Sequence, residues 1–311
     1  PNPMRDAAIA LVLGLVLGVG VAFLLDNLDE RIRGISDLER TAGGLPVLSV
    51  VPEADRRVPA AFVAARDEPQ SATAEAFRSL RTAVKFAGLE RPIKVVQVTS
   101  ATAGEGKTTT AANLAMAFAL AGERVAVVCC DLRRPTLHER FEQTLTPGFT
   151  DVLVGDVTLS NALRKYSSSM MVLPAGSHAP NPSELLGTSR AAGVISALAS
   201  EFDLVVVDSP PVLPVTDSLV VSRLADASLV VVDARSTSRN SLRRTLQLLE
   251  QVNAPTLGVV LNGVSADGGY GYGYGYGYGY GGNGSYGTYV PEAEKPKRRV
   301  RKQKPEPAST G

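Results

Sequence analysis

The segment Ala101–Thr108 reads Ala-Thr-Ala-Gly-Glu-Gly-Lys-Thr, and it separates a run of β-branched residues from a long helical pattern. Glycines at 104 and 106 allow the backbone to curve so that successive N–H groups point at one anion. A helix that begins at Lys107 adds the positive end of its dipole to the same point. This order of strand, loop and helix predicts a phosphate-binding loop, the feature that most constrains the fold and the function of the chain.

The last two residues of the loop predict its ligands. In loops of this kind the lysine, here Lys107, reaches the β- and γ-phosphates, and the hydroxyl of Thr108 holds Mg²⁺. ATP and Mg²⁺ are therefore the predicted ligands. The usual pattern begins with glycine where this chain has Ala101, a mild departure, and a chance Gly-Lys-Thr in a loop is the alternative interpretation. The residues predicted to bind the nucleotide from this loop are Ala103, Gly104, Glu105, Gly106, Lys107, Thr108 and Thr109.

Short β-branched runs alternate with helical patterns between residues 70 and 264. Most of these runs are continuously apolar, as expected for strands that are buried on both faces. The predicted fold class is therefore α/β, a P-loop NTPase with a mostly parallel sheet and helices on both faces. The predicted strands are 94–99, 124–130, 170–173, 204–208, 228–233 and 257–261, with a further candidate at 46–51, and the clearest helical stretches are 108–121 and 240–252.

One apolar run ends in an acidic residue, in the sequence Val205-Val-Val-Asp208-Ser-Pro-Pro211. In open α/β sheets the carboxyl ends of the strands meet the ligand, so Asp208 is placed to hold the water shell of a bound metal. A turn-forming aspartate before Pro210 is the alternative interpretation. The phosphate-binding loop favours the metal site.

The segment Ala7–Leu25 contains no charged or polar side chain. A helix of this length spans about 28 Å, close to the thickness of a bilayer's hydrocarbon core. A cleavable signal peptide is the alternative, but the acidic stretch 26–30 comes directly after it instead of an Ala-x-Ala-like cleavage site. Arg31 and Arg33 lie after the segment and weakly place its C-terminal side in the cytoplasm. We expect one transmembrane helix, a cell-membrane location and a chain that is a piece of a longer protein, since it begins at Pro1 rather than with methionine.

The composition changes abruptly after Val264, and tyrosine alternates with glycine from 270 to 280. Glycine at every second position cannot pack a core, so this tail is predicted to be disordered. A flexible spacer and a self-associating segment are alternative interpretations of the repeat. The predicted organisation is the end of an extracytoplasmic segment at 1–6, a transmembrane helix at 7–25, a juxtamembrane linker at 26–69, a P-loop domain at 70–264 and a tail rich in tyrosine and basic residues at 265–311.

The overall charge and the two cysteines argue against certain partners and sites. A formal net charge of +1 gives no reason to expect nucleic acid as a partner. The two cysteines, Cys129 and Cys130, are adjacent and provide neither a disulfide framework nor zinc-ligand spacing. This fits a domain in the reducing cytoplasm.

Several motifs together resemble the bacterial tyrosine kinases, known as BY-kinases, of capsule and exopolysaccharide synthesis. They are the phosphate-binding loop, the strand that leads into Asp131-Leu-Arg133, and the sequence Val207-Asp-Ser-Pro-Pro211. Further matching segments are 180–186, 212–217 and 258–262. The resemblance covers nearly the whole chain and makes 7–25 the second transmembrane helix of a chain-length-determinant copolymerase.

The resemblance implies a membrane-anchored autokinase that passes the γ-phosphate of ATP to tail tyrosines of a neighbouring subunit and regulates polysaccharide synthesis and export. Its implied partners are further copies of itself in a ring, the membrane through 7–25, the polysaccharide synthesis and export machinery, and a cognate tyrosine phosphatase, but no nucleic acid. The implied phosphoacceptors are Tyr270, Tyr272, Tyr274, Tyr276, Tyr278, Tyr280, Tyr286 and Tyr289.

The resemblance also assigns roles to individual residues. It implies contact between Asn262 and the adenine. Glu75, Arg78 and Arg81 share one helix face at spacings i, i+3 and i+6, and the resemblance makes this face a subunit interface, with a solvated charged face as the alternative. The implied catalytic residues are Lys107, Asp131, Asp208 and Arg133, and the implied metal ligands are Thr108, Asp131 and Asp208.

One position departs from the family pattern Asp-x-Asp-x-Arg, because Cys129 replaces the first aspartate. In the family that carboxylate helps to hold the metal and is the base for the incoming tyrosine hydroxyl. A thiol is a poor ligand for Mg²⁺, and a buried thiol stays neutral. We therefore expect ATP binding to survive, while the departure puts the catalytic rate in doubt.

Two alternatives to an active autokinase remain open. The first is a catalytically weak regulator, in which nucleotide binding only controls assembly of the copolymerase. The second is a partition-type ATPase with the same fold. The second is disfavoured because Thr102 stands where those ATPases carry a signature lysine, and because a membrane helix and a tyrosine tail are predicted.

Overall fold

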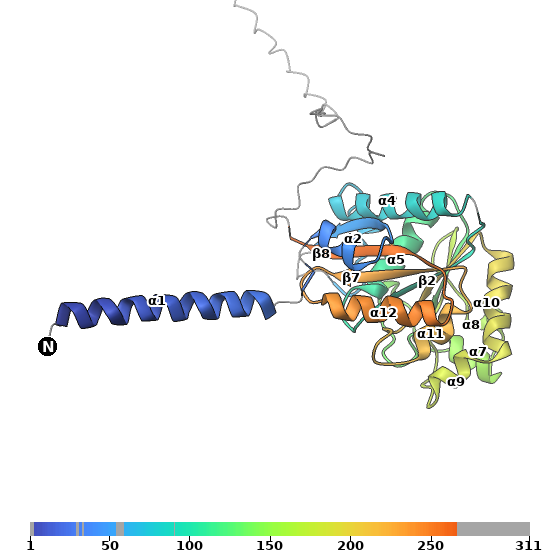
Figure 1. Cartoon of the computed structure of the whole chain (residues 1–311). Coiled ribbons are helices and arrows are strands. Elements are labelled where there is room, and N and C mark those ends of the chain that lie inside the picture. The colour runs from blue at the N-terminus through green and yellow to red at the C-terminus, as the bar shows by residue number, and fades with distance from the viewer. Residues whose placement is uncertain (1–2, 29–30, 33, 54–58, 90, 266–311) are drawn as a thin grey trace, which may run out of the picture. The chain divides into compact units, whose positions relative to one another are not determined.

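The computed structural model describes residues 3–28, 31–32, 34–53, 59–89 and 91–265; side chains at 5–10 and 22–28 lie outside this description. Twelve helices and eight strands form in these residues (Figure 1). The predicted tail at 265–311 lies outside the described residues except for residue 265, and so do all eight implied phosphoacceptors.

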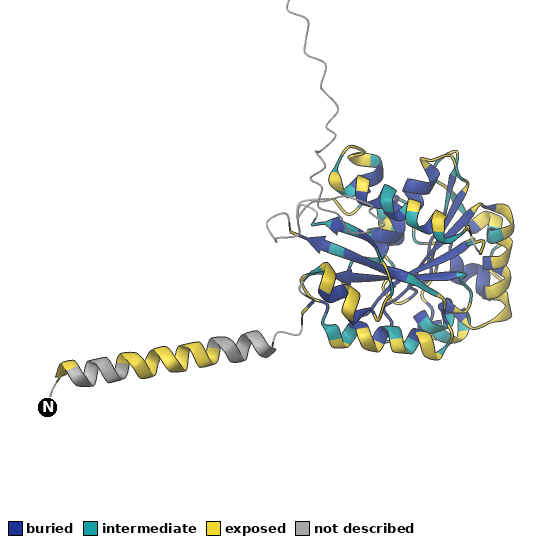
Figure 2. Cartoon of the chain, turned by 45° about the horizontal axis from the view of Figure 1, so that its top comes forward, coloured by how far each residue is buried: buried dark blue, intermediate teal, exposed yellow. Residues whose placement is uncertain are grey.

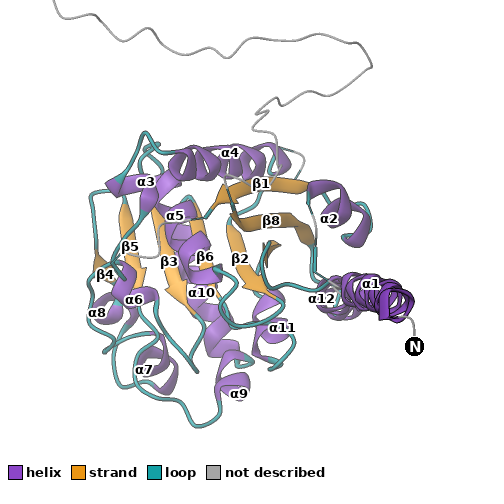
Figure 3. Ribbon diagram, turned by 90° about the vertical axis from the view of Figure 1, so that its left-hand side faces the viewer, coloured by secondary structure: helices purple, strands orange, loops and turns teal. Residues whose placement is uncertain are grey.

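The described residues build one sheet in the order β1-β8-β7-β2-β6-β3-β5-β4. Every neighbouring pair is parallel except β4 and β5, which are antiparallel. Figure 3 shows these strands side by side with helices around them. The strands are β1 (Val47–Pro52), β2 (Val95–Ser100), β3 (Val125–Cys129), β4 (Arg164–Lys165), β5 (Met170–Leu173), β6 (Leu204–Asp208), β7 (Ala227–Asp233) and β8 (Thr256–Val264).

Helices cover both faces of the sheet, so the predicted α/β fold with a mostly parallel sheet is confirmed (Figure 2). The helices of the amino-terminal part are α1 (Pro3–Leu28), α2 (Ile35–Thr41), α3 (Ala64–Asp67), α4 (Ala72–Ala87) and α5 (Lys107–Ala119). The remaining ones are α6 (Leu137–Arg140), α7 (Phe149–Val154), α8 (Leu159–Ala162), α9 (Pro182–Leu186), α10 (Ser189–Glu201), α11 (Asp217–Ser222) and α12 (Arg239–Gln251).

Strand β7 shows why the predicted strands are continuously apolar. Successive side chains of a strand point to opposite faces. Leu229 and Val231 pack in the cluster that contains the apolar residues of α4 and α5, whereas Val230 and Val232 pack with those of α2 and α12. Both faces are thus covered, and every residue of β7 is buried.

The observed strands match the predicted ones to within a few residues. The candidate at 46–51 is β1, which pairs in parallel with β8, so the sheet extends into the segment predicted as a juxtamembrane linker. The two-residue strand β4 was not predicted, because two residues carry no detectable periodicity.

Helix α1 contains the predicted membrane span. In the part of the chain that the structure describes, no helix reaches the length and apolar character needed to cross a membrane. The span predicted at 7–25 includes residues whose side chains lie outside the described set, so it stays a prediction.

Truncation of a core leucine should show that the packing of α4 stabilises this domain. Leu80 is fully buried in the core, and Leu80→Ala should lower the free energy of unfolding by about 2–5 kcal/mol, measured by urea denaturation. Leu120→Ala is the matched control, because Leu120 is 63% exposed and its truncation should change stability by less than about 0.5 kcal/mol. Equal effects of the two substitutions would contradict this packing.

Candidate functional site

The loop between β2 and α5 is curved in the way its glycines predict. Gly104 and Gly106 have φ angles of 86° and 96°, a region that favours glycine. A Cβ on Gly106 would also lie 2.2 Å from Nδ2 of Asn262. Asn262 itself donates from Nδ2 to the backbone oxygen of Glu105 at 3.0 Å. The structure therefore places Asn262, the residue implied to contact adenine, directly against the phosphate-binding loop.

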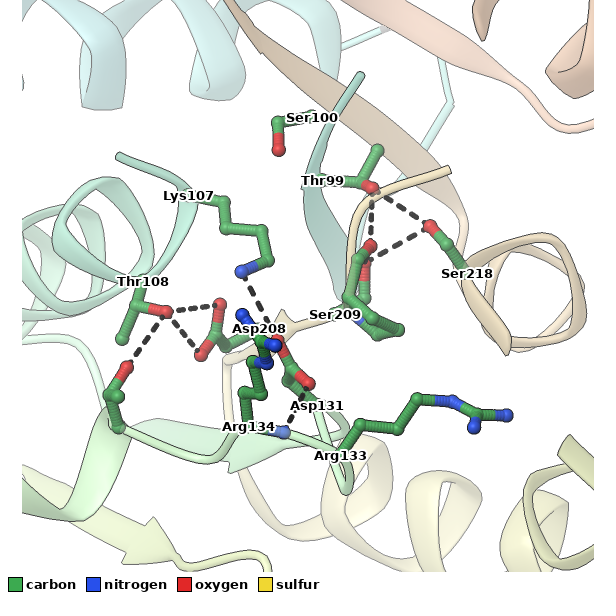
Figure 4. Close-up of polar contacts among 12 residues, drawn as sticks. Thr99, Ser100, Lys107, Thr108, Asp131, Arg133, Arg134, Asp208, Ser209 and Ser218 are labelled. Atoms are coloured by element: carbon green, nitrogen blue, oxygen red, sulfur yellow. Dashed lines mark hydrogen bonds and ion pairs between the residues drawn. The ribbon is translucent and has the colours of Figure 1, made fainter. Parts of the chain in front are cut away.

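Two polar pairs lie at the start of α5. The Lys107 ammonium nitrogen is 3.1 Å from Oδ2 of Asp131, and both side chains are largely buried, at 11% and 5% exposed. The Thr108 hydroxyl lies 2.9 and 3.1 Å from the two carboxylate oxygens of Asp208. Figure 4 shows these four side chains converging on one point. The structure thus brings together four of the residues that the sequence singled out for phosphate and metal binding.

Asp208 has a carboxyl group with a raised pKa. It ends the central strand β6 and is fully buried. Burial raises the pKa of the Asp208 carboxyl to about 7, although the charge of Lys107 and the hydrogen bond from Thr108 lower it. A cation bound next to such a buried carboxyl stabilises the charged form and lowers its pKa.

Cys129 lies beside this carboxyl. In the pairing of β3 with β6, Cys129 is the direct partner of Asp208. The thiol is fully buried, and burial together with the charge of Asp208 raises its pKa well above the ordinary value. The Cys129 side chain is thus buried, and the raised pKa favours the neutral thiol.

Arg133 does not join the cluster. Its guanidinium pairs with the carboxylate of Asp217, at 2.7 and 3.0 Å, and the Ser183 hydroxyl donates to the same carboxylate. In Figure 4 the Arg133 side chain points away from Lys107. Three segments that carried the family resemblance, around 133, 183 and 217, therefore meet in one hydrogen-bonded group. Sequence spacing carried no signal of that meeting.

Some of the charged side chains on the predicted interface face of α4 already have partners within the chain. Arg78 donates from Nε to Glu75 at 2.7 Å. Arg81 instead donates from Nη1 to the backbone oxygen of Ala117, near the end of α5, at 3.0 Å. Glu75 and Arg78 thus form an ion pair on the surface, whereas Arg81 connects α4 to α5 within the chain.

Two residues beside the phosphate-binding loop are not predicted from the sequence, Thr136 and Thr237. The Thr136 hydroxyl lies 3.5 Å from that of Thr108. Thr237, from the turn after β7, donates to the Glu105 carboxylate at 2.7 Å. Neither stands in a recognisable motif. Within the described residues no group of three or more His, Cys, Asp or Glu side chains forms a metal cage.

Comparisons with known proteins agree with this geometry. A family described as "AAA domain" matches residues 93–257. The chain is 36% identical over 202 residues to "Tyrosine-protein kinase YwqD" of Bacillus subtilis, and the match covers 65% of this chain and 85% of that protein. The chain belongs to the bacterial tyrosine kinase family.

Two further relatives show how much of a bacterial tyrosine kinase is present. "Putative tyrosine-protein kinase EpsB" of Ralstonia nicotianae is 34% identical over 275 residues, a match that covers 85% of this chain but only 36% of EpsB. The solved kinase domain of the Escherichia coli tyrosine kinase ETK aligns with a TM-score of 0.69 and 30% identity, covering 78% of this chain and 97% of that domain. The chain therefore contains a bacterial tyrosine-kinase domain and spans about a third of EpsB.

The raised pKa of Asp208 predicts a pH-dependent stability. The pKa of Asp208 in the folded chain, about 7, lies above the ordinary 3.8. The folded state therefore binds the proton more tightly than the unfolded state. The stability that this proton provides is fully present below pH 4 and is lost as the pH rises through 7. At about 1.4 kcal/mol per pKa unit, the loss between pH 5 and 8 should be roughly 2–3 kcal/mol greater in the wild type than in Asp208→Asn. Urea denaturation with Mg²⁺ chelated measures it. If the stability of the two proteins changes in parallel with pH, the raised pKa of Asp208 is contradicted.

Proposed function

We propose that this chain is the catalytic part of a membrane-anchored protein-tyrosine autokinase, which transfers the γ-phosphate of ATP to tail tyrosines of a neighbouring copy. The observation that carries the proposal is the cluster of Lys107, Thr108, Asp131 and Asp208 at the start of α5. This cluster combines the phosphate-binding loop, the ammonium group of Lys107 and the two carboxylates in one place. The family relationship supports the choice of tyrosine as acceptor.

The donor set fits a magnesium ion. Mg²⁺ prefers hard oxygen ligands and keeps several waters, so it is commonly held by one or two carboxylates together with substrate phosphates. Thr108, Asp131 and Asp208 supply such oxygens, and the raised pKa of Asp208 marks a carboxyl that lacks a sufficient counter-charge. The ion would neutralise charge on the phosphate oxygens during transfer.

The residues of the chain divide the remaining work. Backbone N–H groups of the loop and the ammonium of Lys107 hold the phosphates, and Lys107 exchanges Asp131 for the phosphate oxygens when nucleotide binds. In the reaction the tyrosine oxygen forms a bond to the γ-phosphorus, the bond from that phosphorus to the β,γ-bridging oxygen breaks, and the phenolic proton passes to solvent water. ADP and phosphotyrosine are the products.

We propose further that α1 anchors the chain in the cell membrane and that polysaccharide synthesis and export are the regulated process. The sequence supports the anchor, and the described side chains from Leu11 to Val21 include many exposed apolar ones. The Glu75–Arg78 pair on α4 is available for a ring of copies. Membership of the bacterial tyrosine kinase family supports this process, and a cognate tyrosine phosphatase is part of the proposal on the family resemblance alone.

A second candidate function is a nucleotide-binding regulator with weak chemistry, and the buried neutral thiol of Cys129 favours it. At this position a thiol can neither hold Mg²⁺ firmly nor accept the tyrosine proton. Phosphoryl transfer depends mainly on positioning and charge stabilisation, so a slow kinase remains compatible with the site.

Removal of the loop lysine tests the proposed kinase. Purified chain with Mg-ATP should gain phosphotyrosine in an anti-phosphotyrosine blot, and Lys107→Met should lower the initial rate at least about 100-fold, because an electrostatic contact to the transferred phosphate is lost. Lys165→Met on the edge strand β4 is the matched control and should label like the wild type. If the wild-type chain binds ATP but contains no phosphotyrosine after long incubation, the kinase proposal is wrong.

Restoring the carboxylate tests how far Cys129 limits the chemistry. Cys129→Asp should raise the labelling rate about ten-fold or more in Mg²⁺, since a positioned base contributes roughly 10²–10⁴-fold in other enzymes. Cys129→Ser removes the thiol without adding a carboxylate and should give no gain. If Cys129→Asp folds, as judged by circular dichroism, and labels no faster, the site does not need this carboxylate.

A further inference from the structure

Glu105 lies in the phosphate-binding loop, yet its side chain is turned away from the open face of the loop. Its neighbours Thr102, Ala103 and Gly104 are exposed, whereas Glu105 is fully buried. A buried carboxylate is costly unless it is hydrogen-bonded. Glu105 meets that need with three hydrogen bonds, two from Thr102 and one from Thr237.

Two of the three donors come from the loop itself. The backbone N–H of Thr102 donates to Oε2 of Glu105 at 3.0 Å, and the Thr102 hydroxyl donates to Oε1 at 3.0 Å. The carboxylate therefore closes the loop across three residues. The N–H of Thr102 is consumed inside the loop and is not a phosphate donor in this form.

The third donor ties the loop to another part of the sheet. The Thr237 hydroxyl donates to Oε1 of Glu105 at 2.7 Å and accepts from the backbone N–H of Asp233 at 2.9 Å. The same residue is held through its backbone, since its N–H donates to the carbonyl of Asp233 and its own carbonyl accepts from Ile32. Thr237 is almost fully buried. The hydroxyl thus links a firmly held turn at the end of β7 to the loop.

The backbone of Glu105 is fixed as well. Its carbonyl oxygen accepts from the Asn262 side chain at 3.0 Å, and Asn262 lies against Gly106, where no side chain fits. Both ends of Glu105 are therefore held, one by strand β8 and the other by the turn after β7. A loop fixed in this way does not have to be ordered when the phosphates bind, and preorganisation of that kind increases affinity.

We propose that Glu105 is a positioning residue that keeps the phosphate-binding loop in its binding conformation, and that it does so through the hydroxyl of Thr237. Glu105 acts through the loop backbone and does not contact the nucleotide with its carboxylate. The proposal rests on the nucleotide binding of the proposed function and deepens it. It predicts that loss of one buried hydroxyl, in a different segment from the loop, weakens nucleotide binding.

The test measures the dissociation constant of a fluorescent ADP analogue with Mg²⁺, together with the melting temperature, on the whole chain. Thr237→Val should weaken binding roughly ten-fold, the effect expected when a hydrogen bond to a charged group is lost. Thr237→Ser keeps the hydroxyl and should bind like the wild type. Glu105→Gln has nearly the same shape but places an NH2 donor against at least one of the donors that now bond to the carboxylate, the Thr102 N–H or the two hydroxyls. It should also weaken binding, and it provides a second variant if Thr237→Val does not fold.

The matched control is Thr245→Val. Thr245 is equally buried, and its hydroxyl donates one hydrogen bond, to the Ser241 carbonyl at 2.8 Å, on α12 away from the loop. Thr237→Val removes a donated hydrogen bond of the same kind and, in addition, the one accepted from the Asp233 N–H. A purely structural role for Thr237 would lower the melting temperature as in this control and leave the dissociation constant unchanged.

The outcomes separate the two proposals. Weak binding by Thr237→Val and Glu105→Gln, with normal binding by Thr237→Ser and Thr245→Val, supports the positioning role. Wild-type affinity in folded Thr237→Val or Glu105→Gln overturns it and leaves the kinase proposal intact. A wild type that does not bind the nucleotide overturns both.

Discussion

The carboxyl group of Asp208 ends a strand that lies between β2 and β3 and is buried along its whole length. A charge in that position is unstable unless partners compensate it. The compensating groups come from the loop after the neighbouring strand β2: the Thr108 hydroxyl donates to the Asp208 carboxylate, and the charge of Lys107 lowers the pKa of Asp208. The other neighbouring strand, β3, leads into Asp131, a like charge that raises the pKa of Asp208 and forms an ion pair with Lys107. The parallel order of these strands brings all of them to one edge of the sheet, as expected for a ligand site in an open α/β fold. The ion pair of Lys107 with Asp131 and the hydrogen bonds from Thr108 to Asp208 therefore lie at the edge where we propose that phosphate and metal bind.

The same arrangement explains why the replacement at Cys129 leaves the fold intact. Cys129 is the strand partner of Asp208. A small apolar group packs there at no electrostatic cost, and free cysteine is among the residue types most often buried. A second carboxylate at this point would repel Asp208 until a cation is present. In our proposal the chain thus keeps the groups for phosphate and metal, and Cys129 stands where the family resemblance implies a carboxylate.

Much of this could be predicted from the sequence, because the strongest signals are local. The continuously apolar strands, the glycines of the loop and the acid at the end of β6 lie within short windows and obey rules of period and conformation. The rest depends on contacts between distant segments. The pairing of Arg133 with Asp217, the tie from Arg81 to α5 and the hydrogen bond from Thr237 to Glu105 join residues 84, 36 and 132 positions apart. No pattern along the chain shows which of several polar residues meet, so the family resemblance drew attention to Arg133 but could not name its partner.

The cluster at the start of α5 is, in our interpretation, a preformed site for Mg-nucleotide. A crystal structure of the chain with Mg²⁺ and a non-hydrolysable ATP analogue tests this claim most directly. We expect phosphates within the loop 101–108, the Lys107 ammonium moved from Asp131 to the phosphate oxygens, and Mg²⁺ held at Thr108 with Asp208 beside it. An intact Lys107–Asp131 pair, with the nucleotide bound elsewhere on the domain, would contradict it.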